Sequence, residues 1–402
     1  MTGSLLTPSL VGLCRSLTEI LLGIVKALFD ALSLPGVGSW FVSPGVVVFF
    51  TYLIACLVMV IWAMLINLLT MLWVERKLYS RIQDRYGIML SFPWPWSKRY
   101  KRGITNMGWG FLQNVADGVK LLQKENMTPA TADKLLFHAA PALLVSSTVM
   151  VFAVFPFSEN FYYAKVSLGV LFILAALSIG PFSIILAGYS ANNKYTLIGG
   201  LRAAAMMLSY EIPMILCVIA VVVLNGTLDP FEMVAIQERP LMGTILPSWN
   251  VFSPPQMLGF VIFFIAIVAE LERIPFDIPE ADAELVEGWT TEYSGMRFGF
   301  LYGFKWLRQF AASGLLVVLF LGGWNGPIIA TPELLGYPIP ILPQEFWLLI
   351  KIYVVAMIIT WISWSIPRVR ADQVLKIGWS RLIPLALLTI LGAAVFKTMG
   401  WF

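Results

Sequence analysis

The chain has 402 residues and a formal net charge of +4; 59% of its residues are hydrophobic and only 12% are charged. Its mean hydropathy is +0.81. Soluble domains carry about 25% charged residues, and a water-soluble fold of this length could not bury so much apolar surface. A soluble protein is therefore excluded, and we expect the lipid bilayer to be its solvent.

Eight apolar stretches are long enough to cross about 30 Å of hydrocarbon as helices. They are residues 46–74, 135–157, 166–189, 204–225, 256–271, 298–321, 345–366 and 382–400. Before them, "LTEILLGIVKALFDAL" has apolar residues at helical spacing with charged residues on the other side, which predicts an interfacial helix. No removable signal peptide is expected. We predict an all-α integral membrane protein, with an N-terminal interfacial segment (1–45), an eight-helix membrane domain (46–402) and amphipathic interfacial helices.

The basic residues predict the orientation of these helices. If the loop after the first span is cytoplasmic, 21 of the 27 Lys and Arg fall on that side. The positive-inside rule places such loops in the cytoplasm or its organellar equivalent. The same face carries a basic loop (75–134) and an acid-rich loop (272–297). We therefore expect a multi-pass protein of the cell (plasma or inner) membrane whose active face is cytoplasmic.

The basic loop begins with "VERKLYSRIQDRYG", in which Glu75 is followed by two cations. Its simplest interpretation is a stop signal that anchors the first span. Further on, "GFLQNVADGVKLLQKENMTP" places four aliphatic residues on one helical face and charged residues on or near the other. Such a helix lies in the membrane interface or packs against a hydrophilic partner protein. Periodicity does not separate these two alternatives.

A second ionisable position lies near the end of the stretch "AGYSANNKYTLIGGLRAAAMMLSYEIP", which we expect to link the third and fourth spans. Glu211 lies about two turns inside the fourth span. An ionisable group at that depth is costly, so a functional role is the default. Arg202, nine residues earlier, is a possible partner. The alternative is that Glu211 accepts hydrogen bonds from backbone groups freed by Pro213.

Over a third of the 23 acidic residues lie in one short segment. They are Glu270, Glu272, Asp277, Glu280, Asp282, Glu284, Glu287 and Glu292. Apolar residues are interleaved with them, and Pro275 and Pro279 break the helix where the fifth span ends. Irregular backbone near a membrane persists where it is buried in protein or lines a watery cavity. A solvated passive loop is one possibility; the pattern favours a protonatable funnel whose crowded carboxylates have raised pKa values and share protons.

Residues that bind redox centres are scarce. Cys14, Cys56 and Cys217 are isolated and form no CxxC pair, which argues against a disulfide framework, a zinc site or an iron–sulfur cluster. His138 is the single histidine, which argues against haem or a histidine-bound metal. We expect no metal site and no cofactor bound by this chain, so that any redox centre belongs to a partner.

Four motifs, taken in order and spacing, resemble one family of membrane subunits. They are "ERK…R.Q.RYG", "LQ.VADG.KLL.KEN", "NNKY.L.GGLRAA…SYE" and "AE.ER.PFD.PEA..ELV.G..TEYSG". The family is the H-type subunit of the proton-pumping NADH–quinone oxidoreductase, respiratory complex I, the counterpart of mitochondrial subunit 1. The likeness runs from about residue 50 to 385.

The resemblance implies an eight-helix subunit that supplies most of the membrane part of a quinone tunnel and couples quinone reduction to proton pumping. It implies quinone as substrate, and flavin mononucleotide and iron–sulfur clusters in partner subunits. The expected partners are peripheral-arm iron–sulfur and quinone-site subunits, adjacent small membrane subunits, antiporter-like subunits and lipid, but no nucleic acid. No residue of this chain is expected to carry out redox chemistry itself.

The resemblance also assigns residues to two regions. The quinone-site and docking region includes Glu75, Arg76, Arg81 and Asp117. The proton channel and acidic loop include Arg202, Glu211, Glu270, Glu272, Asp277, Glu280, Asp282, Glu284 and Glu292. Asp282 stands where the family usually has Glu, and Glu287 is an extra acid. Residues 87–110 contain an insertion of about a dozen residues relative to the family, and no portal residue is carried across it.

Other functions remain open. A related subunit of a membrane-bound hydrogenase, or of a ferredoxin- or deazaflavin-linked quinone-reducing complex, would share the acid-rich loop. The "ERK" and "ADG.K" motifs favour the quinone branch. A free-standing ion transporter is a third possibility, which the single acid cluster and the lack of repeats disfavour. The sequence identifies neither the electron donor nor the quinone.

Overall fold

The computed structural model describes residues 67–88, 110–159, 161–238, 248–279, 285–326 and 344–399, together with Arg15, Thr18, Glu19, Leu22 and Phe50. The chain is helical over these residues, and no strand occurs among them, as predicted. Glu280, Asp282 and Glu284 lie outside the described residues, as do most of the segment 1–45 and most of the insertion at 87–110.

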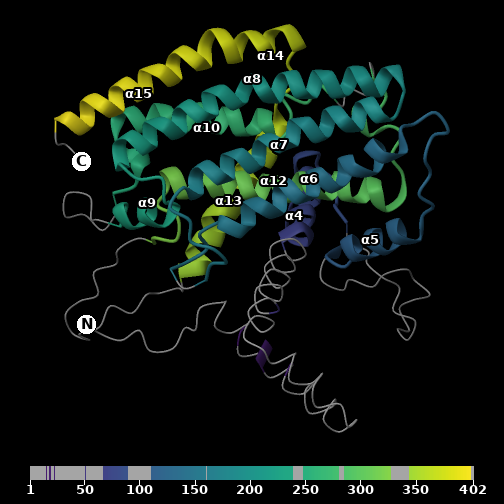
Figure 1. Ribbon diagram of the computed structural model, residues 1–402, viewed down its shortest axis with the longest axis horizontal. Helices are drawn as coiled ribbons and strands as arrows, with labels where there is room; N and C mark the ends of the chain where they lie inside the picture. The colour runs from purple at the N-terminus through teal and green to yellow at the C-terminus, as the bar shows by residue number, and fades with distance from the viewer. Residues whose placement is uncertain are drawn as a thin grey trace, which may run out of the picture.

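The described helices run mainly along the long axis of the molecule (Figure 1). The longer ones are α4 (Asn67–Ile82), α5 (Gln113–Gln123), α6 (Lys134–Val154), α7 (Gly169–Ser190), α8 (Lys194–Asn225), α10 (Pro254–Glu270), α12 (Gly295–Phe320), α13 (Gln344–Ser365) and α15 (Ile383–Thr398). The shorter ones are α9 (Pro230–Ile236), α14 (Ala371–Ile377), the 3₁₀ turns η4 (Asn250–Phe252) and η5 (Gly288–Thr290), and the π-helical turn η7 (Gly378–Leu382).

Five helical segments are long and apolar enough to cross a membrane. They are Lys134–Val154, Gly169–Ser190, Lys194–Asn225, Gln344–Ser365 and Ala371–Thr398. α10 is apolar but has only 17 residues. α12 has 26 residues, and its first 14 residues carry three cations. Each span predicted from residue 135 onward thus coincides with a helix, whereas only the last part of the first span, in α4, is described.

α8 begins ten residues earlier than its predicted span of 204–225. The predicted link between the third and fourth spans is therefore mostly helical, and only residues 191–193 connect α7 to α8. The side chain of Asn193 accepts a hydrogen bond from the amide of Tyr195 at 3.1 Å and so caps the N-terminus of α8. The early start is supported by packing, because Gly200 lies against Gly188 of α7, an approach that small residues allow.

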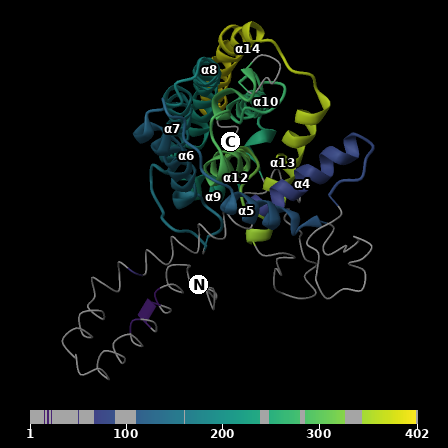
Figure 2. The same cartoon turned by 90° about the vertical axis from the view of Figure 1, so that its right-hand side faces the viewer.

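α12 is the central helix of the described bundle. Seen along the helices, it lies between α6, α7 and α8 on one side and α4 and α13 on the other (Figure 2). Every residue from Trp306 to Phe320 is buried. A helix that is surrounded in this way can contact several elements within one turn, so α12 is placed to connect the rest of the bundle.

The loops gather at two ends of the bundle. At one end, on the right of Figure 1, α5 and the described parts of 83–112, 124–133, 191–193, 271–294 and 366–370 lie together. Hydrogen bonds join them: the amide of Asp133 donates to Ser190 O and that of Val369 to Pro275 O, both at 3.0 Å. We call this the basic end, because it brings together loops that carry most of the predicted cytoplasmic cations. The opposite end, with α9 and η4, is the far end.

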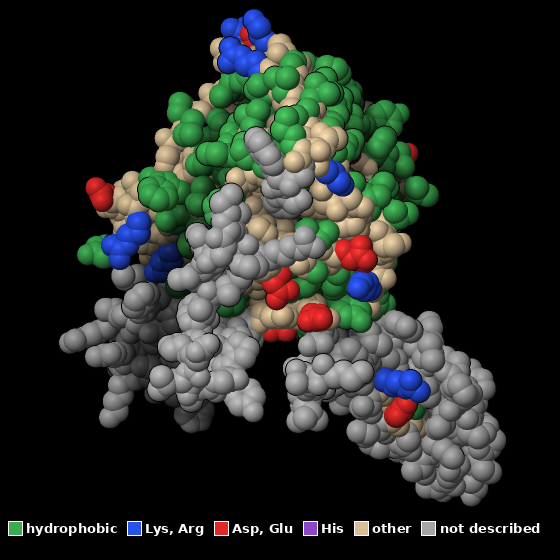
Figure 3. All heavy atoms as spheres, turned by 90° about the vertical axis from the view of Figure 1, so that its left-hand side faces the viewer, with side chains coloured by type: hydrophobic (Ala, Val, Ile, Leu, Met, Phe, Trp, Pro, Cys, Tyr) green, Lys and Arg blue, Asp and Glu red, His purple; other side chains and the backbone are tan. Residues whose placement is uncertain are grey.

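The outer surface of the described bundle is largely apolar. Seen from the far end, hydrophobic side chains cover most of its upper part, and charged side chains are scattered (Figure 3). Large side chains on outer helices are well exposed, such as Phe182 at 62%, Trp361 at 61% and Leu391 at 63%. Such a continuous apolar surface needs an apolar environment, as a bilayer or neighbouring subunits provide.

Candidate functional site

Seven charged residues from four parts of the chain come together inside the bundle, toward its basic end. We call them the charge cluster: Glu75, Glu211, Glu270, Glu272, Arg273, Lys305 and Arg308. One turn of α12, residues 305–309, contacts or faces all the other members. Because an α-helix has 3.6 residues per turn, neighbouring side chains of this turn point toward different elements.

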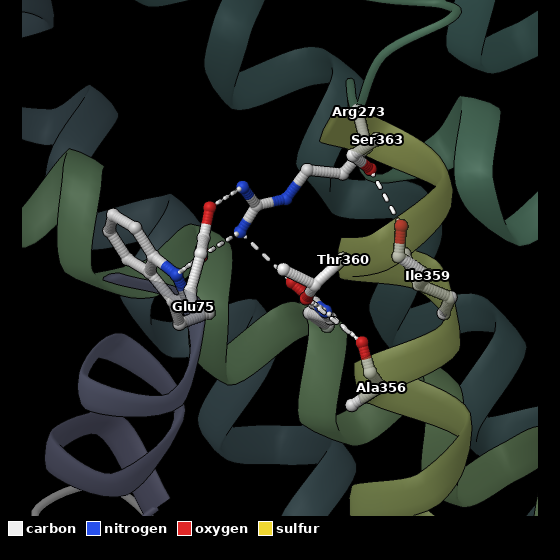
Figure 4. A network of polar contacts seen from close by, with 8 residues as sticks. Glu75, Arg273, Ala356, Ile359, Thr360 and Ser363 are labelled. Atoms are coloured by element: carbon white, nitrogen blue, oxygen red, sulfur yellow. Dashed lines mark hydrogen bonds and ion pairs between the residues drawn. The ribbon is translucent and has the colours of Figure 1, made fainter. Parts of the chain in front are cut away.

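Glu75 of α4 is paired with a cation far away in the sequence. Only 7% of the residue is exposed. Arg273 donates from Nη1 to Oε1 at 2.7 Å and from Nη2 to Oε2 at 3.2 Å, a two-pronged contact (Figure 4). The indole Nε1 of Trp306 also donates to Oε2. Three donors, two of them from a cation, therefore hold this carboxylate in one orientation.

The same network continues into α13. Nη2 of Arg273 also donates to Oε1 of Gln309 at 2.9 Å. Nε2 of Gln309 donates to the carbonyl of Ala356 at 3.0 Å and to the hydroxyl of Thr360 at 3.1 Å. The network thus joins α4, the segment after α10, α12 and α13 (Figure 4). A change in charge at Glu75 or Arg273 would therefore alter hydrogen bonds that connect all four elements.

A second ion pair lies deeper in the bundle. Arg308 donates from Nη2 to Oε1 of Glu270, and the two residues are 7% and 3% exposed. The other oxygen of Glu270, Oε2, is buried and has no hydrogen-bond partner among the described residues. The guanidinium lies against Gly180 of α7, where an added Cβ would come within 2.7 Å of Nη2. The absence of a side chain at residue 180 leaves room for the guanidinium in this position.

Glu211 faces the same cation. It is half-buried, and Arg308 acts on it electrostatically. The sequence suggests Arg202 as its partner, whereas the structure brings a cation from α12, 97 residues further on. Arg202 itself is half-buried on the first part of α8. Arg308 thus stands between carboxylates of α8 and α10.

Glu272 completes the charge cluster from the first turn after α10. Nζ of Lys305 lies 3.8 Å from its Oε2 and 5.7 Å from the centre of the Trp289 ring. Glu272 is only 6% exposed and has a φ of 50°, in the left-handed region that non-glycine residues rarely occupy. Such strain persists when the surroundings hold it in place, and here it directs a carboxylate inward.

The acid-rich segment beyond Glu272 is folded against the bundle. Phe276, Leu285 and Trp289 are 7%, 4% and 1% exposed. Asp277 is 8% exposed and pairs with Arg368 at 3.0 Å. Glu292 accepts a hydrogen bond from Nδ2 of Asn193 at 2.8 Å. The described part of this segment is therefore not a freely solvated loop.

Tyr293 anchors the end of that segment. Its ring stacks on Phe137 with centroids 4.1 Å apart, and its hydroxyl donates to the Phe137 carbonyl at 3.3 Å. Burial raises the pKa of Tyr293 to about 12, against smaller opposing effects of Ser190 and Arg297. The phenol therefore remains a neutral donor throughout the physiological pH range.

The four residues assigned to the quinone side are divided among three environments. Glu75 belongs to the charge cluster. Arg76 links α4 to α5 through Asp117 at 2.7 Å, and their side chains are 32% and 35% exposed. Arg81, in the last turn of α4, is exposed. Asn114 and Asp117 of α5 face Arg76 of α4, and Leu121 lies against Gly299 of α12. Three other aliphatic residues of α5 are exposed: Val115, Val119 and Leu122, the last at 65%.

Sequence reasoning misses the turn of α12 that connects the charge cluster. From the sequence, Lys305 and Arg308 serve only to predict which side of the membrane the loops face, and no motif points to Trp306 or Gln309. A signal is nevertheless present in "KWLRQ", because two cations and an amide interrupt an otherwise apolar span. Polar residues inside a span face protein or water rather than lipid.

One close contact sets the position of the acid-rich segment on α8. A Cβ added to Gly199 would lie 2.8 Å from Cα of Gly288 and 2.9 Å from the amide of Trp289. We expect Gly199→Ala to displace this backbone and lower stability by about 1–3 kcal/mol, although alanine is by itself the better helix former by about 1 kcal/mol. Thermal unfolding of the purified protein measures the effect.

Gly118 provides the matched control. It is also helical, and nothing lies within 4 Å of an added Cβ. Gly118→Ala should leave the midpoint unchanged or raise it. Equal midpoints for the two variants would contradict the proposed contact.

Comparison with known proteins points to one family. A family model described as NADH dehydrogenase matches residues 54–394. The chain is 43% identical over 290 residues to the H-type subunit of NADH-quinone oxidoreductase from Bacillus mycoides (strain KBAB4), and 42% identical over 290 residues to the protein of the same name from Bacillus cereus (strain B4264). In both cases the match covers 72% of this chain and 81% of the relative.

Proposed function

The chain belongs to the NADH dehydrogenase family, and we propose that it is a membrane subunit of a proton-translocating NADH–quinone oxidoreductase, complex I. Its relatives are named as the H-type subunit of NADH-quinone oxidoreductase, which favours this complex over a hydrogenase or a free-standing transporter. In this proposal eight helices cross the membrane, the basic end faces the cytoplasm, and flavin and iron–sulfur clusters belong to partner subunits.

The charge cluster is the observation that supports a coupling role. Four carboxylates, Glu75, Glu211, Glu270 and Glu272, face three cations in a largely buried region. The imbalance leaves a place for a proton among the carboxylates, since crowded carboxylates in a low dielectric share protons. The buried, unpartnered Oε2 of Glu270 is one atom where it could reside.

The proposed mechanism is electrostatic. Reduction of quinone near the basic end changes the charge and the proton demand there. Arg273 spans from Glu75 toward α13, so a change beside Glu75 alters the field at the rest of the cluster. A shift of one pKa unit corresponds to about 1.4 kcal/mol, and shifts of a few units shared among coupled carboxylates would move a proton toward the membrane arm.

The quinone would approach between α4 and α5. The support is geometric: Arg76 and Asp117 join these helices, Glu75 precedes Arg76 in α4, and α5 exposes Val115, Val119 and Leu122. An isoprenoid tail needs apolar contacts, whereas the quinone head needs hydrogen-bond donors, which the basic end provides. Quinone-tunnel and docking roles for Glu75, Arg76, Arg81 and Asp117 are part of this proposal.

The coupling proposal predicts a large fall in activity when Glu211 loses its charge, although among the described residues Glu211 has no cation within 4 Å. Glu211→Gln removes a titratable group without changing shape. We expect quinone reductase and proton-pumping rates of the assembled complex to fall at least about tenfold, the scale of a lost proton-transfer group, while the complex still assembles. Rates are measured in membranes with a quinone substrate and a pH-sensitive dye.

The matched control is Glu238→Gln, since Glu238 is exposed at the far end. It should leave both rates unchanged. Wild-type rates in Glu211→Gln would refute a proton-carrying role for the charge cluster, and loss of assembly would be visible on native gels.

A further inference from the structure

The far end of α12 is held by side chains from three other elements. The last carbonyls of a helix lack partners within the helix. Here Nε2 of Gln237 donates to the Val318 carbonyl at 3.0 Å, and Nδ2 of Asn250 donates to the Leu319 carbonyl at 2.7 Å. The third donor is a lysine from inside α13, and it is unusual for the number of carbonyls that it binds.

Lys351 places its ammonium group among three backbone oxygens. Nζ lies 2.6 Å from the Leu321 carbonyl, 2.9 Å from that of Gly323 and 2.6 Å from that of Asn325. An ammonium has three N–H donors, so each hydrogen has an acceptor. The Leu321 carbonyl lies at the C-terminal end of α12, whose partial negative charge favours a cation there.

An aromatic ring closes the fourth side of this group of oxygens. Nζ of Lys351 lies 4.5 Å from the centre of the Trp249 ring, within the range of a favourable cation–π contact. The ring can approach because residue 322 is glycine. A Cβ on Gly322, whose φ is +70°, would lie 2.6 Å from Cδ1 of Trp249. The carbonyls and the ring together form a cage shaped for a small cation, with no carboxylate among the groups that contact the ammonium in the described residues.

We propose that this cage is a monovalent-cation site that the chain fills with its own Lys351, and that Lys351 is a positioning residue for the charge cluster. The cage fixes the end of α12. Residues 309 and 321 are separated by about 18 Å along the helix axis at 1.5 Å per residue. Because α12 is buried from Trp306 to Phe320, a displacement at the cage shifts the turn 305–309 against its partners.

Chemical rescue tests the proposal on the assembled complex. Lys351→Ala removes the three carbons and the nitrogen beyond Cβ, which n-propylammonium can replace. We expect the thermal midpoint to fall by roughly 4–8 °C and the quinone reductase rate to fall roughly tenfold or more. Added n-propylammonium should restore both in a saturable way, whereas tetramethylammonium at equal ionic strength should not, because it has no N–H donors and is too large.

Two further variants act as controls. Lys351→Met fills the same space with an apolar side chain, so it should show the same losses and no rescue. Lys397 of α15 also contacts a helix end, donating to the Val223 carbonyl at 2.8 Å, but it is exposed and makes this single carbonyl contact. Lys397→Ala should have a small effect that n-propylammonium does not change.

The two measurements separate the parts of the proposal. No rescue of Lys351→Ala, or a Lys351→Met protein as stable as the wild type, would overturn the cation site. A rescued midpoint with an unrescued rate would overturn the positioning role. The midpoint does not depend on the proposed quinone chemistry, so failure of that function would leave the test of the site intact.

Discussion

Arg308→Met is expected to destabilise the protein by about 3–5 kcal/mol, the cost of leaving one member of a buried ion pair without its partner. Methionine has a similar length but no charge, so Glu270, only 3% exposed, would lose its cation. Glu211 would lose the same cation. The free energy of unfolding of the purified chain in mixed detergent–SDS micelles measures the loss.

The double variant Arg308→Met/Glu270→Gln separates the electrostatic cost from loss of packing. It removes both charges, so most of the stability should return, since a buried ion pair can often be replaced by neutral groups at little cost. If the charge cluster carries the coupling, the stable double variant should still assemble but lack proton pumping. A double variant as unstable as Arg308→Met would contradict the assigned pair, and one that pumped normally would contradict the role of the cluster.

Glu75→Gln should have the second largest effect. Gln cannot balance the charge of Arg273, and one of its two former oxygens is now a donor that faces the guanidinium. Since the Arg273 and Glu75 side chains are only 14% and 9% exposed, we expect a loss of about 3 kcal/mol and a fall in quinone reductase rate of roughly tenfold or more. Unfolding in mixed micelles and quinone titrations of the assembled complex measure the two effects.

Asp117→Asn is the control for Glu75→Gln, because it removes the carboxylate of an ion pair that is more exposed. Asp117 and Arg76 form a pair of the same length, 2.7 Å, but about a third of each side chain is exposed. Water screens exposed pairs, so this variant should lose about 1 kcal/mol or less. If both variants lost the same stability, burial would not be what distinguishes the two pairs. If neither changed the rate with quinone, the assignment of this region to the quinone site would fail.

The contrast also shows how the two assigned regions are connected. The resemblance treats Glu75 as part of the quinone side and Glu270 and Glu272 as part of the proton channel. In the structure, Arg273 follows Glu272 directly in the chain and binds Glu75. The two regions that the resemblance assigns separately therefore meet within a few residues, and α12 supplies the polar turn that contacts both.

Some features of the site can be predicted because they depend on one segment at a time. The longer helices α6, α7, α8, α10, α12, α13 and α15 follow from long apolar runs, whereas the short α9 and α14 are not predicted. The burial of Phe276 and Trp289 follows from their place among acids near a membrane. The early start of α8 is not predicted, because residues 194–203 are not apolar enough to be a span. They are helical because Asn193 caps them and because small residues pack closely against α7.

Composition and periodicity are enough to predict a membrane environment, a helical architecture and the segment in which acids gather. Each of these can be read from the sequence without knowing how the helices pack. Which cation meets which acid depends on how the helices pack. Glu75 and Arg273 are 198 residues apart, and the rotation of α12 about its axis, which aims Arg308 at Glu270, depends on the helices that surround it. No pattern within a single helix contains that rotation, since it results from contacts between helices.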